Sequence, residues 1–93
     1  MALRFEWNER KAELNLRAHG VSFREATTVF ADPLSITISD PDHSMTETRF
    51  IDLGVSYRGR LLVVSYTERG DRIRLISARL ATRDERKQYE EAS

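Results

Sequence analysis

The spacing of apolar residues changes along the chain and divides it into short predicted elements. Residues 3–7 alternate between apolar and polar side chains, as a short strand does. A helix is expected from Glu9 to His19, with Asn8 as its N-cap and Gly20 just after its last turn. Its inward face is predicted to consist of four apolar residues, Ala12, Leu14, Leu16 and Ala18.

A second helix is predicted to begin just after Ser22. Ser22 and Glu25 have the spacing of a capping box, in which the hydroxyl and the carboxylate each bond the backbone N–H of the other residue. Pro33 ends this helix, because the residue before a proline is pushed out of the helical region. The helix is therefore short.

Two strands are predicted next, separated by a polar loop over residues 40–44. Residues 34–39 alternate, and the side expected to be buried carries Leu34, Ile36 and Ile38. Residues 48–56 form the second of these strands, with Ile51, Leu53 and Val55 facing inward. Gly54 is a candidate β-bulge within it.

A hairpin and a last helix are predicted in the run from Tyr57 to Tyr89. Residues 61–66 and 73–79 are rich in β-forming side chains, and a loop of four to five residues joins them as antiparallel strands. Gly70 supplies the positive φ that such a turn needs. Thr82 and Glu85 then form a second capping box, which starts a short terminal helix.

The predicted fold class is α+β, with the order β-α-α-β-β-β-β-α over a single domain of residues 1–93. Two N-terminal helices are expected to pack on one face of a mainly antiparallel, twisted sheet. A short C-terminal helix completes the chain.

Charge is divided unequally between two parts of the chain. From Tyr57 to Tyr89 there are nine Arg or Lys against four acids, whereas residues 25–56 hold six acids and Arg49 alone. The net charge of zero therefore hides a basic C-terminal part, which suits a polyanion such as RNA, and an acidic middle part. A solvated, arginine-rich sheet face explains the same basic count. The acidic part is a candidate surface for a protein partner.

Composition limits the function classes further. No apolar run approaches the roughly 18–20 residues that span a bilayer, and no export signal is evident, so a cytoplasmic location is expected. The absence of cysteine excludes disulfides and Cys-based zinc sites or nucleophiles. The two histidines, His19 and His43, are distant in sequence and form no zinc motif, so no metal and no cofactor are assigned.

Several blocks of the chain together resemble one known family. They are F-E-W-N-x-x-K-A-x-x-N at residues 5–15, H-G-V-S-F-x-E-A at 19–26, V-F-A-D-P at 29–33, Y-T-E-R-G-D at 66–71 and R-L-I-S-A-R-x-A-T-R-x-E-R-x-x-Y at 74–89. In this order and spacing they resemble the BrnT family of bacterial type II toxins. One departure is Asn8, where the family pattern leads us to expect Asp; both residues cap helices.

The resemblance implies a fold and a set of partners that the spacing of residues alone does not supply. It implies a RelE-like ribonuclease fold and a toxin that cleaves RNA and so inhibits translation. It also implies a cognate antitoxin of the BrnA type that binds DNA, held with the toxin in a hetero-oligomer.

Metal-independent RNA cleavage needs a base for the 2′-hydroxyl, an acid for the 5′-oxygen and cations for the charge at phosphorus. His19 is a candidate acid, because the C-terminus of a helix favours the imidazolium; a helix-capping role fits it equally. Glu68 is a candidate base at the hairpin, or else the partner of Arg69 or Arg72 in an ion pair. Which group is base and which is acid stays open at this point.

Arginines are the candidates for the phosphate clamp, because a guanidinium pairs bidentately with phosphate. Arg69 and Arg79 complete the catalytic set, and Arg79 and Arg83 are expected to point into one cleft. Further candidates for RNA or phosphate binding are Lys11, Arg74, Arg86 and Tyr89. Tyr89 either stacks on a base or packs against the sheet, and Trp7 is interpreted as a core residue.

The competing hypothesis is a catalytically inert module that binds nucleic acid or protein through the same arginine-rich face. Loss of toxicity on replacing Arg79 or His19, without unfolding, distinguishes the ribonuclease from this module.

Overall fold

The computed structural model describes residues 3–40 and 48–92, with the backbone alone for Ser39 and Asp40. Its elements in chain order are β1 (Arg4–Glu6), α1 (Glu9–His19), α2 (Phe23–Thr27), the 3-10 helix η1 (Thr28–Ala31), β2 (Ile36–Asp40), β3 (Arg49–Val55), β4 (Leu61–Arg69), β5 (Arg72–Leu80) and α3 (Arg83–Ala92). Most of the predicted loop between β2 and β3, His43 included, lies outside the described residues.

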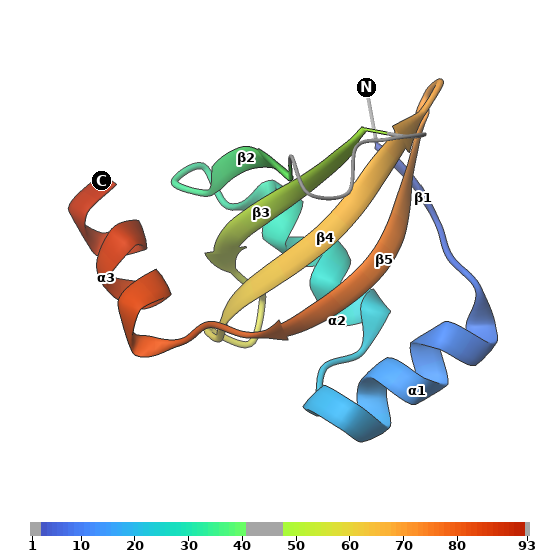
Figure 1. Ribbon diagram of the computed structural model, residues 1–93, viewed down its shortest axis with the longest axis horizontal. Coiled ribbons are helices and arrows are strands. Elements are labelled where there is room, and N and C mark those ends of the chain that lie inside the picture. The colour runs from blue at the N-terminus through green and yellow to red at the C-terminus, as the bar shows by residue number, and fades with distance from the viewer. Residues whose placement is uncertain (1–2, 41–47, 93) are drawn as a thin grey trace.

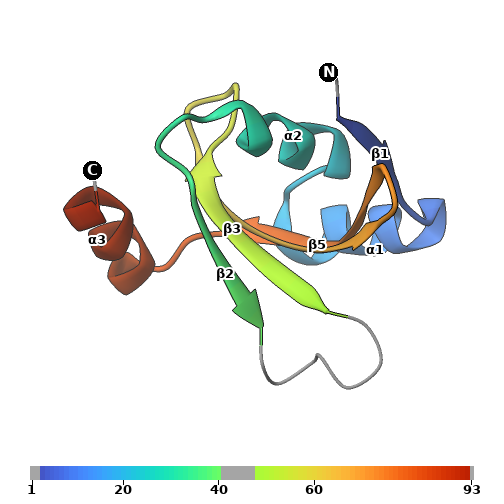
Figure 2. The same ribbon diagram turned by 90° about the horizontal axis from the view of Figure 1, so that it is seen from above.

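The described strands form one five-stranded sheet in the order β1-β5-β4-β3-β2. β1 runs parallel to β5, and every other neighbouring pair is antiparallel. Figure 1 shows α2 behind this sheet, α1 below β5 and α3 beside one end of the sheet, and Figure 2 shows the same arrangement from above. The α+β class is therefore confirmed, with a mixed, mainly antiparallel sheet.

The central strand β4 defines two faces of the sheet, because side chains alternate along a strand and directly paired residues point to the same side. We call the face carrying Leu62, Val64 and Tyr66 the covered face, since these residues belong to one core with α2 and η1. We call the face carrying Val63, Ser65 and Thr67 the open face. Among the described elements, α3 alone packs against the open face, at one end.

The covered face holds the main hydrophobic core. Its fully buried members include Val21, Phe23, Leu62 and Val64. Rings close its ends: Phe30 lies 5.1 Å from Phe5 and 4.9 Å from Tyr66, centroid to centroid. Trp7 packs edge-on against Phe23 at 6.1 Å, as a partly buried part of this core. Trp7 therefore does contribute to packing.

The prediction for the inward face of α1 was wrong at three of its four positions, because Leu14, Leu16 and Ala18 are exposed and only Ala12 is partly buried. Leu14 and Leu16 are about half exposed, and the buried residue between them is Asn15. Its side chain donates to the carbonyls of Val21 and Ala78 at 2.9 and 2.8 Å and accepts from the Ala78 N–H at 3.1 Å. Asn15 thus satisfies the backbone of β5 beyond the short β1, which explains a polar residue at the centre of the interface.

The predicted buried side of the strand after Pro33 was also wrong. Leu34 is 53% exposed because it lies in the turn before β2, and Ile38 is 54% exposed because β2 is an edge strand and Ile38 points to the open face beside Ile51. Gly54 is not a bulge either. A Cβ there would lie 2.8 Å from Cγ1 of Val29, so this glycine permits the close approach of η1 to β3.

The hairpin is tighter than predicted. β4 and β5 extend to Arg69 and Arg72, which leaves a two-residue loop in which Gly70 has a φ of 62°. The register skips Ile76, since Ser65 pairs with Ser77 and Tyr66 pairs with Leu75. The only bulge along this hairpin therefore lies in β5.

The two predicted capping boxes differ in outcome. Thr82 and Glu85 bond each other's backbone N–H at 3.2 and 2.8 Å, so this box is complete. At α2, Ser22 accepts from the Glu25 N–H at 3.0 Å, but the Glu25 carboxylate turns away to Ser56 and Arg60. Glu25 is buried, and the Arg60 guanidinium lowers its pKa.

Candidate nucleic-acid interface

The open face gathers basic and hydroxyl side chains from three neighbouring strands. Register pairs Arg49 with Thr67 and Thr67 with Arg74, so these three side chains form a row across β3, β4 and β5. The next row contains Ser65 and Ser77. We call the following set the basic half of the open face: Arg49, Ser65, Thr67, Arg69, Arg72, Arg74, Ser77 and Arg79.

The bulge at Ile76 decides which arginines share this face. Arg74 and Arg79 are five residues apart, and in a regular strand residues at an odd spacing point to opposite sides. The extra residue shifts the alternation, so that Arg74 lies opposite Thr67 and Arg79 lies opposite Val63, both on the open face. The bulge therefore brings the two guanidiniums to one side of β5.

Two carboxylates hold these arginines in place. Glu6 accepts from Arg74 at 3.0 Å and from Arg72 at 3.3 Å, and the bond from Arg74 is the main reason that its pKa is lowered. Glu85 of α3 accepts twice from Arg79, at 2.8 and 2.9 Å. This bidentate pair lowers the pKa of Glu85 to about 2. Both carboxylates are therefore ionised at neutral pH, and among the described residues of this face the arginines outnumber the carboxylates that hold them.

Thr67 lies at the centre of the row and is fully buried. Within the described part of the chain, its hydroxyl oxygen is the buried side-chain polar atom that has no hydrogen-bond partner. Such an atom is costly in a folded protein and calls for an explanation. It lies between Arg49 and Arg74 but is closed to solvent, so a phosphate or sugar hydroxyl bound there would supply the partner only once the side chains around it move.

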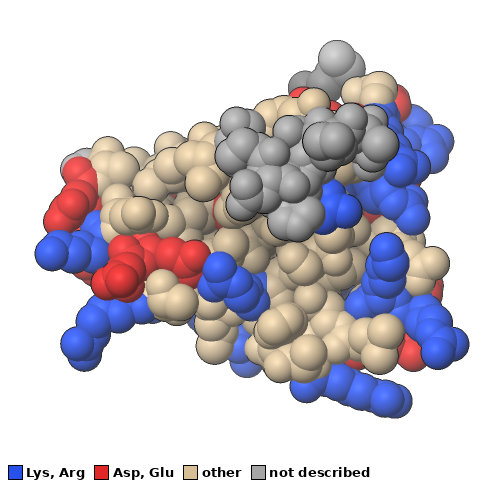
Figure 3. Space-filling view, viewed as in Figure 1, with Lys and Arg blue, Asp and Glu red and all other residues tan. Residues whose placement is uncertain are grey.

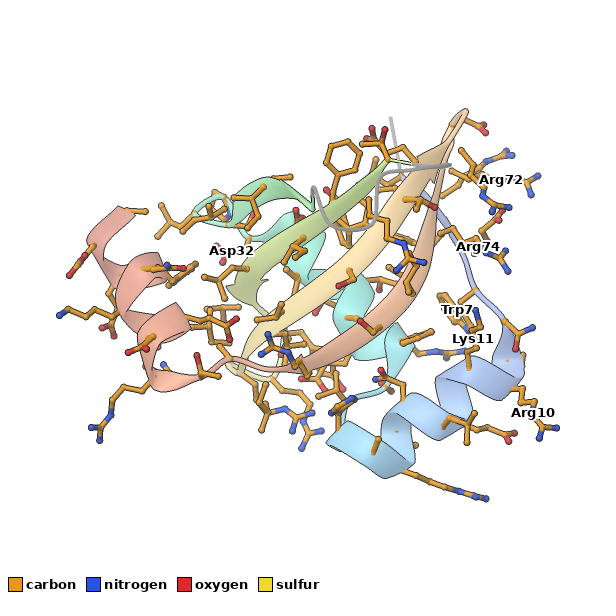
Figure 4. All side chains as sticks on the ribbon, viewed as in Figure 1. Trp7, Arg10, Lys11, Asp32, Arg72 and Arg74 are labelled. Atoms are coloured by element: carbon orange, nitrogen blue, oxygen red, sulfur yellow. The ribbon has the colours of Figure 1, made fainter. Side chains whose placement is uncertain are left out.

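The basic surface continues around the β1–β5 side of the molecule. Figure 3 shows Lys and Arg gathered on that side, at the right of the view, whereas the surface over β2 is mostly neither basic nor acidic. Figure 4 shows Lys11, Arg10 and Trp7, from α1 and the segment before it, on the same side as Arg72 and Arg74. The predicted binding residues Lys11 and Arg74 therefore lie on the same side of the molecule in this view.

The predicted acid and base lie at opposite ends of β5. Glu68 is paired with Ile73 near the hairpin loop. His19 lies one helical turn beyond Asn15, which bonds Ala78 at the far end of the strand. Five residues separate Ile73 from Ala78, a distance of about 17 Å along an extended strand. The structure does not bring His19 and Glu68 together.

The predicted arginine clamp is divided in the same way. Arg69 pairs with Arg72 at the hairpin loop, whereas Arg79 lies seven residues further along β5, roughly 23 Å away. The expectation that Arg69, Arg79 and Arg83 act as one phosphate clamp was therefore wrong for Arg69. Arg83 and Arg86 belong to α3, whose Glu85 bonds Arg79.

Tyr89 packs rather than presenting its ring to solvent. It lies against the apolar cluster of Leu53, Leu61 and Val63, and its hydroxyl donates to Oδ2 of Asp32 at 2.6 Å. This bond raises the pKa of Tyr89 to about 12. Burial raises the pKa of Asp32, but the bonds from Tyr89 and from two backbone N–H groups outweigh it and lower the pKa overall.

Two of the described acids in the middle part of the chain are buried and do not contribute to a surface for a partner. Glu25 and Asp52 are each only 3% exposed. Asp52 accepts from the hydroxyls of Thr37 and Tyr66, and burial raises its pKa. The side chain of Asp40, and Asp42, lie outside the described part of the structure. Asp52 therefore supports the fold, and a charge reversal at this position would test folding and not partner binding.

Comparison with known proteins decides the family. The sequence profile described as "Ribonuclease toxin, BrnT, of type II toxin-antitoxin system" matches residues 7–85. The chain belongs to the BrnT family. It is therefore a ribonuclease toxin, and an antitoxin partner follows from the type II class.

A solved structure agrees with the fold of this BrnT-family chain. It is the 1.1 Å crystal structure of the Brucella abortus ribonuclease toxin BrnT, which matches with a TM-score of 0.64 at 19% identity. The match covers 88% of this chain and all of that one. A comparison with curated proteins found no match.

Several residues of the basic half escaped the sequence reasoning. Arg49 is an isolated basic residue in an acidic stretch, and nothing local shows that it pairs with Thr67. Ser65 and Ser77 lie in predicted strands and Thr67 just beyond one, and no local signal marks them as binding residues. A strict count of alternation from Arg74 would have found Arg72 but would have placed Arg79 on the wrong face.

The described residues contain neither a metal-binding group of side chains nor a membrane-spanning helix. Over 3–40 and 48–92 there is no group of three or more His, Asp or Glu side chains placed to hold a metal ion. None of the helices in that same part of the chain has the length and apolar content needed to cross a membrane.

Proposed function

We propose that this BrnT-family ribonuclease holds RNA on the basic half of the open face and cleaves it by metal-independent transesterification. The toxin thereby inhibits translation. In this proposal residues 1–93 form one RelE-like domain that acts in the cytoplasm.

The observation that carries the proposal is the row of Arg49, Thr67 and Arg74, with Arg79 further along the same face. Metal-free cleavage develops negative charge on the phosphorane oxygens, and guanidiniums placed beforehand stabilise that charge. Each also forms two parallel bonds to a phosphate, which fixes the strand. The carboxylates of Glu6 and Glu85 keep Arg74 and Arg79 in position without neutralising the face.

The proton-transfer groups divide into two sets that cannot serve one phosphate together. At the hairpin end the candidate base is Glu68, which pairs with the core residue Ile73 and so points to the covered face, away from Arg69 on the open face. At the other end His19 acts as acid or base, with Arg79 and the first turn of α3 as phosphate ligands. The proposal therefore assigns cleavage to one end of β5 and binding of the RNA strand to the other end. Separate replacement of His19 and Glu68 distinguishes the ends, since one variant loses cleavage and its counterpart loses only affinity.

The partner in this proposal is a cognate, DNA-binding antitoxin of the BrnA type. The two proteins form a hetero-oligomer in which the antitoxin neutralises the toxin. The type II class of the family supports a protein partner, and the charge of the open face supports an acidic contact surface on it.

The test is incubation of the purified chain with a defined RNA in EDTA, followed by analysis of the product ends. Cleavage that leaves 2′,3′-cyclic phosphates is expected, because the 2′-hydroxyl is the nucleophile. A matched reaction in Mg²⁺ should be no faster. Loss of cleavage in EDTA, with recovery in Mg²⁺, would contradict metal independence. Binding of RNA without cleavage in either buffer would favour the inert module instead.

A cell-free translation reaction tests the second part of the proposal. The wild-type chain should stop protein synthesis, and prior addition of the antitoxin should prevent this. Continued synthesis in the presence of an active ribonuclease would show that its RNA target lies outside translation.

A further inference from the structure

Beside the basic half, the open face carries an apolar groove of about 60 Å³. Its lining is Ile36, Ile38, Ile51, Leu53, Val63, Glu85 and Gln88. β2 and β3 supply one wall and the floor, and α3 supplies the opposite wall. We call this feature the α3 groove.

The α3 groove exposes aliphatic surface in a place where the chain itself leaves it uncovered. Ile38 is 54% exposed, and β2 is an edge strand of the sheet. Ile51 and Ile36 are only half-buried, although both pack against the cluster of Leu53 and Val63. An apolar groove rimmed by charged residues is typical of an interaction site.

The chemistry of the lining distinguishes a protein ligand from a nucleobase. Bases are bound by stacking on aromatic rings or on free guanidinium planes, and their edges are read by hydrogen bonds. All five apolar residues of the groove are Ile, Leu or Val, and its carboxylate, Glu85, is already bonded to Arg79. The groove therefore suits the branched aliphatic side chain of a protein.

The charge around the groove indicates which kind of protein segment would bind there. Glu85 lines the groove and holds Arg79, so the groove and the basic half meet at this ion pair. A segment seated in the groove would continue directly onto Arg79 and then onto the row of Arg49 and Arg74. Carboxylates following an aliphatic anchor would match both surfaces in sequence.

We propose that the α3 groove is the docking site for the antitoxin, which inserts an aliphatic anchor there and lays acidic residues across the arginines of the open face. The inference rests on the proposed function of that face, since a segment bound in this way covers the arginines that would hold RNA. Neutralisation is then direct occlusion of the RNA site.

The test compares two substitutions on the same short stretch of chain. Ile38→Asp places a carboxylate in the groove, whereas Leu34→Asp places one at a residue of matched exposure that does not line it. The dissociation constant is measured for the purified full chain with the antitoxin encoded beside it. Because a groove anchor behaves as a hot spot, Ile38→Asp should raise that constant at least about tenfold, and Leu34→Asp by less than about twofold.

A second variant in the groove keeps the proposal testable if Ile38→Asp does not fold. Gln88→Glu is nearly isosteric, and Gln88 is an exposed residue that lines the open groove, so the fold should tolerate the change. Its added carboxylate faces the groove and should also weaken the antitoxin several-fold. Melting curves of all three variants establish that each is folded before the constants are compared.

RNA cleavage by the free variants separates this proposal from the function on which it rests. Ile38→Asp should cleave a defined RNA at the wild-type rate. Equal antitoxin affinities of Ile38→Asp and Leu34→Asp would overturn the docking site. Weakened RNA cleavage with normal antitoxin affinity would also overturn it, and would identify a nucleobase pocket. If the wild type cleaved no RNA, the affinity comparison would still decide docking, and only the proposed function would fail.

Discussion

The two faces of the sheet are made by the same strands and differ in what they contain. On the covered face, β4 contributes Leu62, Val64 and Tyr66 to a core sealed by α2 and η1. On the open face, the intervening residues lie among arginines or beside an apolar groove. Alternation along β4 therefore places residues of the main core on the covered face and the residues proposed to bind RNA on the open face.

This contrast teaches that the basic half of the open face can change with little cost to the fold, whereas the buried cluster of Leu53, Leu61 and Val63 on the same face cannot. The carboxylates that organise it, Glu6 and Glu85, act through ion pairs on a partly exposed surface, where such pairs add little stability. Their contribution is to the geometry of the arginines. Substitutions on the two faces should accordingly separate unfolding from loss of activity.

The largest effect on stability is expected from Leu62→Ala on the covered face. Leu62 is fully buried, and removal of its methyl groups leaves a cavity that costs about 2–5 kcal/mol. The free energy of unfolding from urea titration measures this. Leu80→Ala is the control, because Leu80 pairs with Leu62 but is about half exposed. Equal losses at the two positions would contradict the view that this face carries the core.

The largest effect on activity is expected from Arg74→Ala on the open face. Removing one preorganised donor from a site of developing charge costs about 10²–10³ in rate. The free energy of unfolding should change by less than about 1 kcal/mol, since its ion pair with Glu6 is partly exposed. Arg17→Ala on exposed α1 should leave the cleavage rate unchanged. A similar rate loss in both variants would indicate a general charge effect.

The ion pair between Glu85 and Arg79 should make stability depend on acid pH. The folded pKa of Glu85 is lowered to about 2, so its contribution is complete above the unfolded pKa and is lost as the pH falls from about 4.5 towards 2. Glu85→Gln should therefore be less stable than wild type at pH 7 by roughly 1 kcal/mol, and this difference should disappear across that window. Urea titrations between pH 7 and pH 2.5 measure it. A difference independent of pH would contradict the view that the ionised form of Glu85 stabilises the fold.

The smallest effect on stability is expected from Thr67→Val. The hydroxyl has no partner in the described structure, so an isosteric apolar replacement should leave the free energy of unfolding unchanged or raise it by up to about 1 kcal/mol. Cleavage of RNA should nevertheless slow, because the central donor of the row is gone. Ser77→Ala on the same face gives a reference for loss of a hydroxyl. A destabilised Thr67→Val would show that the hydroxyl is satisfied in solution and that the explanation by ligand binding is wrong.

Local signals predicted most of the helix ends and turns. Asn8, Gly20 and the pair of Thr82 and Glu85 cap helices as their residue types indicate. Gly70 has the positive φ expected of it. These features depend on contacts within a few residues, so the sequence around each one contains the necessary information.

The composition of the open face could not be predicted in the same way. Arg49 and Arg74 meet across Thr67 through pairings between distant segments, and the bulge at Ile76 changes the face of Arg79. The positions of the helices decide which side of a strand is covered. Ile38 was predicted to be buried from alternation alone, but it is 54% exposed. Asn15 was overlooked because its partner, Ala78, lies 63 residues away.

The central claim is that RNA binds the open face, and methyl NMR tests it most directly. A 2′-deoxy oligonucleotide, which lacks the nucleophile and cannot be cleaved, is titrated into the labelled chain. The largest shifts are predicted at the methyl of Thr67, with smaller ones at Ile51 beside it and little change at Leu14 and Leu16 on α1. Largest shifts on α1, with Thr67 unmoved, would contradict the account.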